Sequence, residues 1–235
     1  HRLMVTSATY RQSSRATKEQ MARDPQNVLL ARGPRHRVDA EAVRDIALSV
    51  SGLLNPKIGG PSVYPPQPEG VTALAYGMAA WPTSSGSERY RRGLYTFIKR
   101  AAPFAAFATF DMPTSEVTCT RRERSNTPLQ ALTMLNDPVY LEASKALADR
   151  VIREAGADTG DRIRHAYRLV LGREAKAEES RMISEFLDHQ RERATKGEIR
   201  IDGGKDKPSS EAAERVAWFA VARALLNLDE TISKE

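Results

Sequence analysis

The stretch NDPVYLEASKALADRVIREAGADTGDRIRHAYRLVLG, residues 136–172, decides the fold class because its apolar residues recur at helical spacing. Pro138 suits a first helical turn, and Gly156 and Gly172 suit helix ends. The stretch therefore predicts two consecutive helices, over about residues 138–156 and 161–172. Their apolar stripes consist of Val139, Ala143, Leu147 and Val151 in the first helix and of Ile163, Ala166, Tyr167, Val170 and Leu171 in the second.

Three further segments carry the same periodicity. Residues 39–54 begin with Asp39, a suitable N-cap, and place apolar residues along one face. Residues 176–193 predict a helix with a charged surface. Residues 209–228 carry the cleanest apolar stripe in the chain, opened by Ser209 or Ser210. Together these segments predict a helical body formed by residues 39–54 and 127–228.

Shorter helices are predicted over residues 89–101 and 128–135, and Leu3, Met4 and Ala8 have helical spacing at the start of the chain. The apolar–polar alternation that is typical of strands is scarce. The sequence therefore predicts a mainly α-helical protein, one helical domain over residues 1–235, with little or no sheet.

Residues 55–86, NPKIGGPSVYPPQPEGVTALAYGMAAWPTSSG, differ in kind from the helical segments. They hold six of the 13 prolines and five of the 14 glycines, which excludes a long helix or a central strand. The aromatic residues Tyr64, Tyr76 and Trp81 argue against simple disorder. We expect a long irregular strap that either covers the hydrophobic core or presents a binding surface. Residues 198–210 are polar and predict an exposed loop.

The composition excludes several classes of protein. With 235 residues, 40% of them hydrophobic, the chain is long enough to bury a core without disulfides. Its one cysteine, Cys119, cannot form an internal disulfide or a thiolate zinc site. The HExxH, GxGxxG, GxxxxGK[ST] and GxSxG patterns are absent from the sequence. We therefore expect this chain to bind no metal and no cofactor, and Cys119 to be an inert buried residue rather than an activated thiolate.

The net charge of +6 is unevenly distributed. Residues 1–100 hold fifteen Lys and Arg against seven Asp and Glu, whereas residues 131–235 hold eighteen against twenty. This asymmetry is a weak indication of polyanionic partners. No apolar run approaches the ~18–20 residues that a membrane span requires, so none is expected.

Residues 110–138, FDMPTSEVTCTRRERSNTPLQALTMLNDP, gather charged and amide side chains around one short apolar helix. Because an unpaired buried charge costs several kcal/mol, these groups must be solvated or paired with one another. One interpretation is a structural network of arginine–carboxylate pairs. The other is a pocket for an anion or a sugar, in which Arg121 or Arg124 binds two ligand oxygens. The candidate ligand-binding residues are Tyr64, Trp81, Asp111, Glu116, Arg121, Arg122, Arg124, Asn126, Asn136 and Asp137.

The block RRERSNTPLQALTMLNDP, with HRLMVTSATYRQSS, IGGPSVYPPQPEG, RRGLYTFIKRAAPFAAFATFDMPTSEV and WFAVARALLNLDE, resembles the planctomycete-type domain of unknown function PSD-one. The likeness covers nearly the whole chain. It implies the C-terminal part of a large exported protein that often carries a cytochrome-c-like segment, and a periplasmic or otherwise extracytoplasmic location. The resemblance places the start of the domain upstream of His1 and supplies no catalytic residues. Thr118 stands where the family has a cysteine, with Cys119 one position later, which weakens any redox role for the thiol.

The leading hypothesis is a non-catalytic binding or scaffolding module of an exported multidomain protein, recognising carbohydrate or an anionic polysaccharide through residues 55–86 and 111–137. Its other partners are further domains of the same parent protein. The alternative is part of a periplasmic hydrolytic or cytochrome-linked redox assembly, with haem elsewhere in the parent protein. Asp111 with Glu116 or Asp137 would then serve as acid and base. Nucleic-acid binding comes third, since the exported setting and the acidic C-terminal half argue against it.

Overall fold

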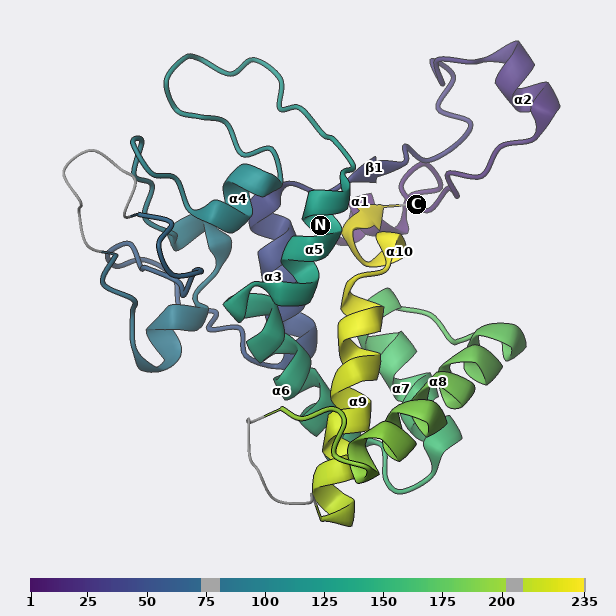
Figure 1. Ribbon diagram of the computed structural model, residues 1–235. Helices are drawn as coiled ribbons and strands as arrows, with labels where there is room; N and C mark the ends of the chain where they lie inside the picture. Colours follow the sequence, from purple (N-terminus) through teal and green to yellow (C-terminus); the bar gives the residue numbers. More distant parts are fainter. Residues whose placement is uncertain (73–80, 202–208, 235) are drawn as a thin grey trace.

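The computed structural model describes residues 1–72, 81–201 and 209–234 (Figure 1). The α-helices are α1 (Arg2–Thr6), α2 (Lys18–Arg23), α3 (Ala40–Ser51), α4 (Ala105–Thr109), α5 (Pro128–Asn136), α6 (Pro138–Glu154), α7 (Thr159–Leu171), α8 (Ala177–Thr195), α9 (Ser210–Leu226) and α10 (Asp229–Ile232). Two short 3₁₀ helices, η1 (Gly86–Tyr90) and η2 (Gly93–Tyr95), and two strands, β1 (His36–Arg37) and β2 (Ser233–Lys234), complete the elements. The antiparallel β1–β2 pair is the only sheet among the described residues. The predicted mainly α-helical fold is therefore confirmed.

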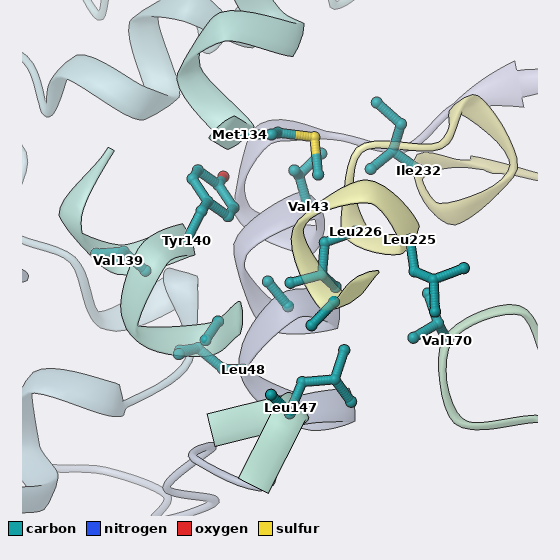
Figure 2. Packing of buried hydrophobic residues seen from close by; sticks show 14 of the residues in the cluster. Val43, Leu48, Met134, Val139, Tyr140, Leu147, Val170, Leu225, Leu226 and Ile232 are labelled. Carbon is teal, nitrogen blue, oxygen red and sulfur yellow. The ribbon is translucent and has the colours of Figure 1, made fainter. Parts of the chain in front are cut away.

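Helix α9 lies at the centre of the helical body. It packs against α6 and α8, and α3 packs against α6 in turn (Figure 1). Ala217 and Ala222 of α9 are buried, and such small side chains let neighbouring helices approach closely. Figure 2 shows the apolar side chains that meet in this core, among them Val43, Leu48, Met134, Val139, Tyr140, Leu147, Val170, Leu225, Leu226 and Ile232. No helix in the described part of the chain is long and apolar enough to cross a membrane.

The helix boundaries follow their sequence signals closely. At the start of α5, the amide of Thr127 donates to Oε1 of Gln130 at 3.4 Å. Asp137 caps α6, because its carboxylate accepts a hydrogen bond of 3.0 Å from the amide of Val139. Gly172 ends α7 with a φ of 69°, a left-handed conformation that glycine adopts without strain. The five long helices predicted from periodicity are confirmed to within a few residues.

The strap over residues 55–86 is irregular, as predicted, in the parts that the structure describes; Tyr76 lies outside them. Arg91 anchors its first part. The Arg91 side chain is fully buried and donates hydrogen bonds to the carbonyl oxygens of Gly59 and Pro61. Its guanidinium also lies 3.7 Å from the ring centroid of Tyr95. A buried arginine therefore adds to the few backbone hydrogen bonds that this proline-rich segment forms.

The prediction of a helix over residues 89–101 is wrong. The segment contains the end of η1 and all of η2, and its backbone pairs with the strap: the amide of Val63 donates to the carbonyl oxygen of Tyr95 at 2.8 Å. Gly93 also lies directly against α3, where an added Cβ would come within 2.8 Å of the carbonyl oxygen of Glu41. Tertiary contacts of the backbone, rather than local periodicity, determine this segment.

Only the beginning and end of the loop predicted over residues 198–210 can be compared, since residues 202–208 lie outside the described residues. Ile199 and Ile201 are half-buried and pack against a small apolar cluster between α8 and α9. The described beginning of this segment is therefore partly anchored rather than fully exposed.

Residues 1–35, the N-terminal arm, lead away from the helical body before the chain returns to it at β1 (Figure 1). Helix α1 ends at Thr6, so it does not continue to Ala8 as the spacing suggested; Ser7 has an extended backbone with a ψ of 148°. No apolar side chain of the arm is buried. The arm therefore has no core of its own.

Candidate functional site

The polar cluster lies mainly on the loop that joins α4 to α5, and Asp111 holds the base of this loop. The Asp111 carboxylate accepts hydrogen bonds of 2.8 Å from the amide and the hydroxyl of Ser125. It also pairs at 2.5 Å with the buried guanidinium of Arg37. Burial raises the pKa of Asp111, but the hydrogen bonds from Ser125 and the charge of Arg37 outweigh burial and lower the pKa below its usual range. Asp111 is therefore a firmly held carboxylate at neutral pH.

Two arginines fix the flank of the loop to the start of α3. Arg122 binds both carboxylate oxygens of Glu41, at 2.7 and 3.1 Å. Arg124 lies 3.5 Å from Asp39 and is more exposed. These two candidate residues are thus occupied by ion pairs within the protein.

The candidates Asn126, Asn136 and Asp137 contact other parts of the protein. Asn126 donates to Asp229 at 3.4 Å, beside α10. Asn136 donates to the carbonyl oxygen of Leu132 within α5, and Asp137 is buried at the start of α6. None of the three candidates lines the hollow that the loop forms, so the sequence cluster does not form one site.

The loop forms an open hollow of about 400 Å³. Its lining consists of Asp111, Met112, Pro113, Thr114, Val117, Thr118, Cys119, Thr120, Arg121, Arg122 and Glu123. Arg121 is exposed there and forms no ion pair or hydrogen bond with any described residue. Cys119 is also exposed, so the expectation of a buried cysteine is wrong. Glu116 is exposed beside the hollow without lining it.

The strap aromatics Tyr64 and Trp81 pack against other rings rather than against the hollow. Tyr64 meets Trp81 edge to face, with ring centroids 5.2 Å apart, and stacks on Phe97 at 4.8 Å. Trp81 stacks on Phe104 at 5.9 Å, and its Nε1 donates to the carbonyl oxygen of Pro65 at 2.7 Å. The two rings therefore attach the strap to the core. Neither ring lines the hollow that contains Arg121.

The family model for PSD1, described as a protein of unknown function (DUF1553), matches residues 1–187. The chain belongs to this family. The match includes the arm, the strap, the hollow and the helices up to the middle of α8, and it confirms the resemblance seen in the sequence. No curated protein and no solved structure shows significant similarity to the chain.

Sequence reasoning missed three residues that build the base of the loop in this PSD1 protein, namely Arg37, Ser125 and Gln130. Gln130 is buried and donates to the carbonyl oxygen of Thr109 at 3.0 Å and to the hydroxyl of Ser125 at 3.1 Å. Arg37 lies 74 positions before its partner Asp111, and no local pattern connects the two. In the described part of the chain, no group of three or more His, Cys, Asp or Glu is arranged to hold a metal ion.

Asp137 predicts a pH-dependent effect on the stability of the PSD1 fold. Burial raises the pKa of its carboxyl from 3.8 to about 6. The folded state therefore binds the proton more tightly than the unfolded state. Protonation of Asp137 thus favours folding, and the free energy of unfolding falls as the pH rises from about 4 to about 6. Asp137→Asn keeps an oxygen that can accept from the amide of Val139 but carries no charge.

We expect Asp137→Asn to raise the free energy of unfolding by about 2–3 kcal/mol at pH 8 and to change it little near pH 4. Urea denaturation of parent and variant at both pH values measures the difference. A stabilisation of the same size at both pH values would contradict the assignment to this carboxyl.

Proposed function

We propose that this PSD1 chain is a non-catalytic binding or scaffolding module of an exported multidomain protein, and that the hollow at residues 111–123 binds an anionic oligosaccharide. The observation that carries the proposal is the state of Arg121. It lines the hollow without a partner among the described residues, whereas Arg122 and Arg124 are paired with side chains of α3 or its cap. A free guanidinium beside a hollow can bind two oxygens of a sulfate or carboxylate group.

The size and lining of the hollow support a sugar ligand. Its volume of about 400 Å³ falls within the ~300–1,000 Å³ of small-molecule sites. Thr118 and Thr120 contribute hydroxyl groups, which both donate and accept hydrogen bonds. Met112 and Val117 add apolar surface for the carbon–hydrogen face of a sugar ring. The lining also holds the exposed carboxylate of Glu123, while Arg122 and Asp111 are paired elsewhere. One unpaired cation, the neutral hydroxyls and a small apolar patch together suit an anionic sugar better than a bare inorganic ion.

The contacts at the base of the loop suggest that the loop is already ordered before a ligand binds. Arg37, Ser125 and Gln130 hold Asp111 from different elements, and Arg122 fixes the flank of the loop through Glu41. A loop that is fixed at its base and flank loses little conformational freedom when a ligand binds. This arrangement suits a preorganised binding surface.

The hydrolytic alternative receives less support from the geometry. Asp111 has a lowered pKa and is bonded to Arg37, which makes it a poor proton donor at neutral pH. Asp137 has a pKa suited to an acid but is buried at a helix start outside the hollow. The exported setting, the link to a cytochrome-c-like domain and the contacts with other domains rest on the family resemblance and are proposed on that basis alone.

Replacing Arg121 with alanine is expected to lower the affinity for a sulfated oligosaccharide about tenfold or more, because a charge-assisted pair to the sulfate is lost. Titration calorimetry with a sulfated galactan hexasaccharide near physiological salt measures the effect. Arg181→Ala on α8 is the matched control, since Arg181 is exposed and forms no ion pair with a described residue.

Two outcomes would contradict the proposed site. Equal losses for Arg121→Ala and Arg181→Ala, together with a steep decrease of binding in salt, would indicate nonspecific attraction of polyanions. No binding by the parent protein to neutral or sulfated oligosaccharides would leave only the scaffolding role, whose partner is the rest of the parent protein.

A further inference from the structure

The N-terminal arm carries an apolar tip, residues 24–32, which no described part of the protein covers. The side chains of Val28, Leu29 and Leu30 are 74, 70 and 57% exposed, and they follow one another directly in the chain. The preceding helix α2 lies at the outer end of the arm, away from the helical body (Figure 1). Adjacent exposed apolar residues of this kind mark surfaces that contact proteins or membranes.

Internal hydrogen bonds hold the tip in one conformation. The Asp24 carboxylate accepts from the amides of Val28 and Leu29, at 2.9 and 2.8 Å. Asn27 accepts from the amide of Arg32 at 3.2 Å and donates to the carbonyl oxygen of Arg32 at 2.7 Å. These backbone groups have partners within the loop, so they can leave water without losing their hydrogen bonds. The tip is thus suited to a medium of low polarity.

Leu30 is exposed and also has a backbone conformation that is unfavourable for leucine. Its φ is 52°, in a region that bulky residues rarely occupy. Arg32 supports this turn by donating to the carbonyl oxygens of Asp24 and Pro25, at 2.9 and 2.8 Å. The loop therefore holds an aliphatic side chain in solvent in a conformation that a leucine does not favour by itself.

Positive charge accompanies the tip. The N-terminal arm holds seven of the 36 Lys and Arg and two of the 30 Asp and Glu, so it carries +5 of the net charge of +6. The side chains of five of these cations form neither an ion pair nor a hydrogen bond with a described residue: Arg2, Arg11, Arg15, Lys18 and Arg23. Lys18 and Arg23 lie on α2, directly before the tip, whereas Arg11 and Arg15 line a hollow with Glu179 and Glu230 at the base of the arm. The tip therefore has two unneutralised cations beside its exposed aliphatic side chains.

We propose that the N-terminal arm docks on an anionic lipid bilayer, with Val28, Leu29 and Leu30 inserted among the lipids and the free cations at the headgroup phosphates. A bilayer suits a narrow projecting tip because lipids rearrange around it, whereas a protein partner must supply a preformed groove. Insertion of aliphatic side chains and attraction of cations to anionic lipid act together, since either signal alone gives weak attachment. The inference does not depend on the hollow at residues 111–123.

Sedimentation with vesicles tests the proposal. The parent protein is expected to bind vesicles of equal parts phosphatidylglycerol and phosphatidylcholine, and to bind pure phosphatidylcholine vesicles at least tenfold more weakly. Leu29→Asp is expected to lower the affinity for the anionic vesicles about tenfold or more. Leu129→Asp is the matched control, because Leu129 is an exposed leucine of α5 far along the chain from the arm. Thermal unfolding of both variants checks that the fold is retained.

The remaining outcomes discriminate among explanations. Arg121→Ala is expected to bind anionic vesicles as the parent does, so a failed oligosaccharide site leaves this proposal unaffected. Vesicle binding that Leu29→Asp does not change would overturn insertion of the tip. Absence of vesicle binding, with a self-association in sedimentation equilibrium that Leu29→Asp abolishes, would overturn the lipid proposal and assign the tip to contact with a second copy of the chain.

Discussion

Replacement of Arg37 by alanine is expected to lower the free energy of unfolding by about 3–5 kcal/mol. The buried guanidinium of Arg37 pairs with Asp111 and donates to the carbonyl oxygens of Ser125 and Phe110. Without Arg37, the Asp111 carboxylate keeps its hydrogen bonds to Ser125 but loses its countercharge. Because this carboxylate is partly buried, water compensates only in part. Urea denaturation followed by circular dichroism measures the loss.

Arg124 provides a matched control from the same loop. It lies 3.5 Å from Asp39 and is exposed, so Arg124→Ala is expected to cost less than about 1 kcal/mol. Because the folded state lowers the pKa of Asp111, the stability from its pair with Arg37 is fully present above the usual value near 3.8 and is lost as the pH falls through the lowered value. The cost of Arg37→Ala should therefore shrink in acid. Equal costs for the two alanine variants would contradict this account.

Local sequence signals were sufficient for the long helices. The apolar stripe of residues 138–156 and the signals at Pro138 and Gly172 act within one or two turns, so they could be interpreted without knowledge of the rest of the fold. The stripe of residues 209–228 likewise predicts α9, whose buried face the core packing then uses. Helices specified by their own sequence are the part of this structure that periodicity predicts well.

Contacts between distant segments could not be predicted in the same way. The sequence indicated that the charged residues of 110–138 must be solvated or paired with one another, but the partners of Arg122 and Asp111 are Glu41 and Arg37, which come from outside that cluster. The same limitation explains the error at residues 89–101, where pairing with the strap overrides helical spacing. Spacing along a chain carries no information about partners that only the folded state brings together.

The candidate site was predicted in part. The sequence indicated the loop and nominated Arg121, but it could not separate the one unpaired arginine from its paired neighbours Arg122 and Arg124. It also grouped Tyr64 and Trp81 with the ligand-binding candidates, although both rings pack against other aromatic residues. An aromatic residue in an irregular segment suits core attachment and ligand contact equally, and only the position of its ring distinguishes the two.

Trp218→Ala is expected to lower the free energy of unfolding by about 3–5 kcal/mol, because the change opens a cavity in the centre of the helical body. Trp218 lies on α9 and is fully buried in the main apolar core. Its Nε1 also donates to Glu214 at 2.9 Å, one turn earlier on the same helix. Urea denaturation followed by circular dichroism at 222 nm, where α-helices give a strong negative signal, measures the loss without relying on the fluorescence of the deleted indole.

Trp218→Phe separates the cavity from the hydrogen bond. Phenylalanine fills much of the space but cannot donate, while Arg162 and Arg191 still pair with Glu214 at 2.9 and 2.7 Å. Because those arginines keep the carboxylate satisfied, the loss for Trp218→Phe is expected to stay near 1–2 kcal/mol, about the cost of a smaller cavity and one hydrogen bond. A loss for Trp218→Phe as large as that for Trp218→Ala would mean that the bond to Glu214, rather than the filling of space between α9 and its neighbours, is what Trp218 contributes.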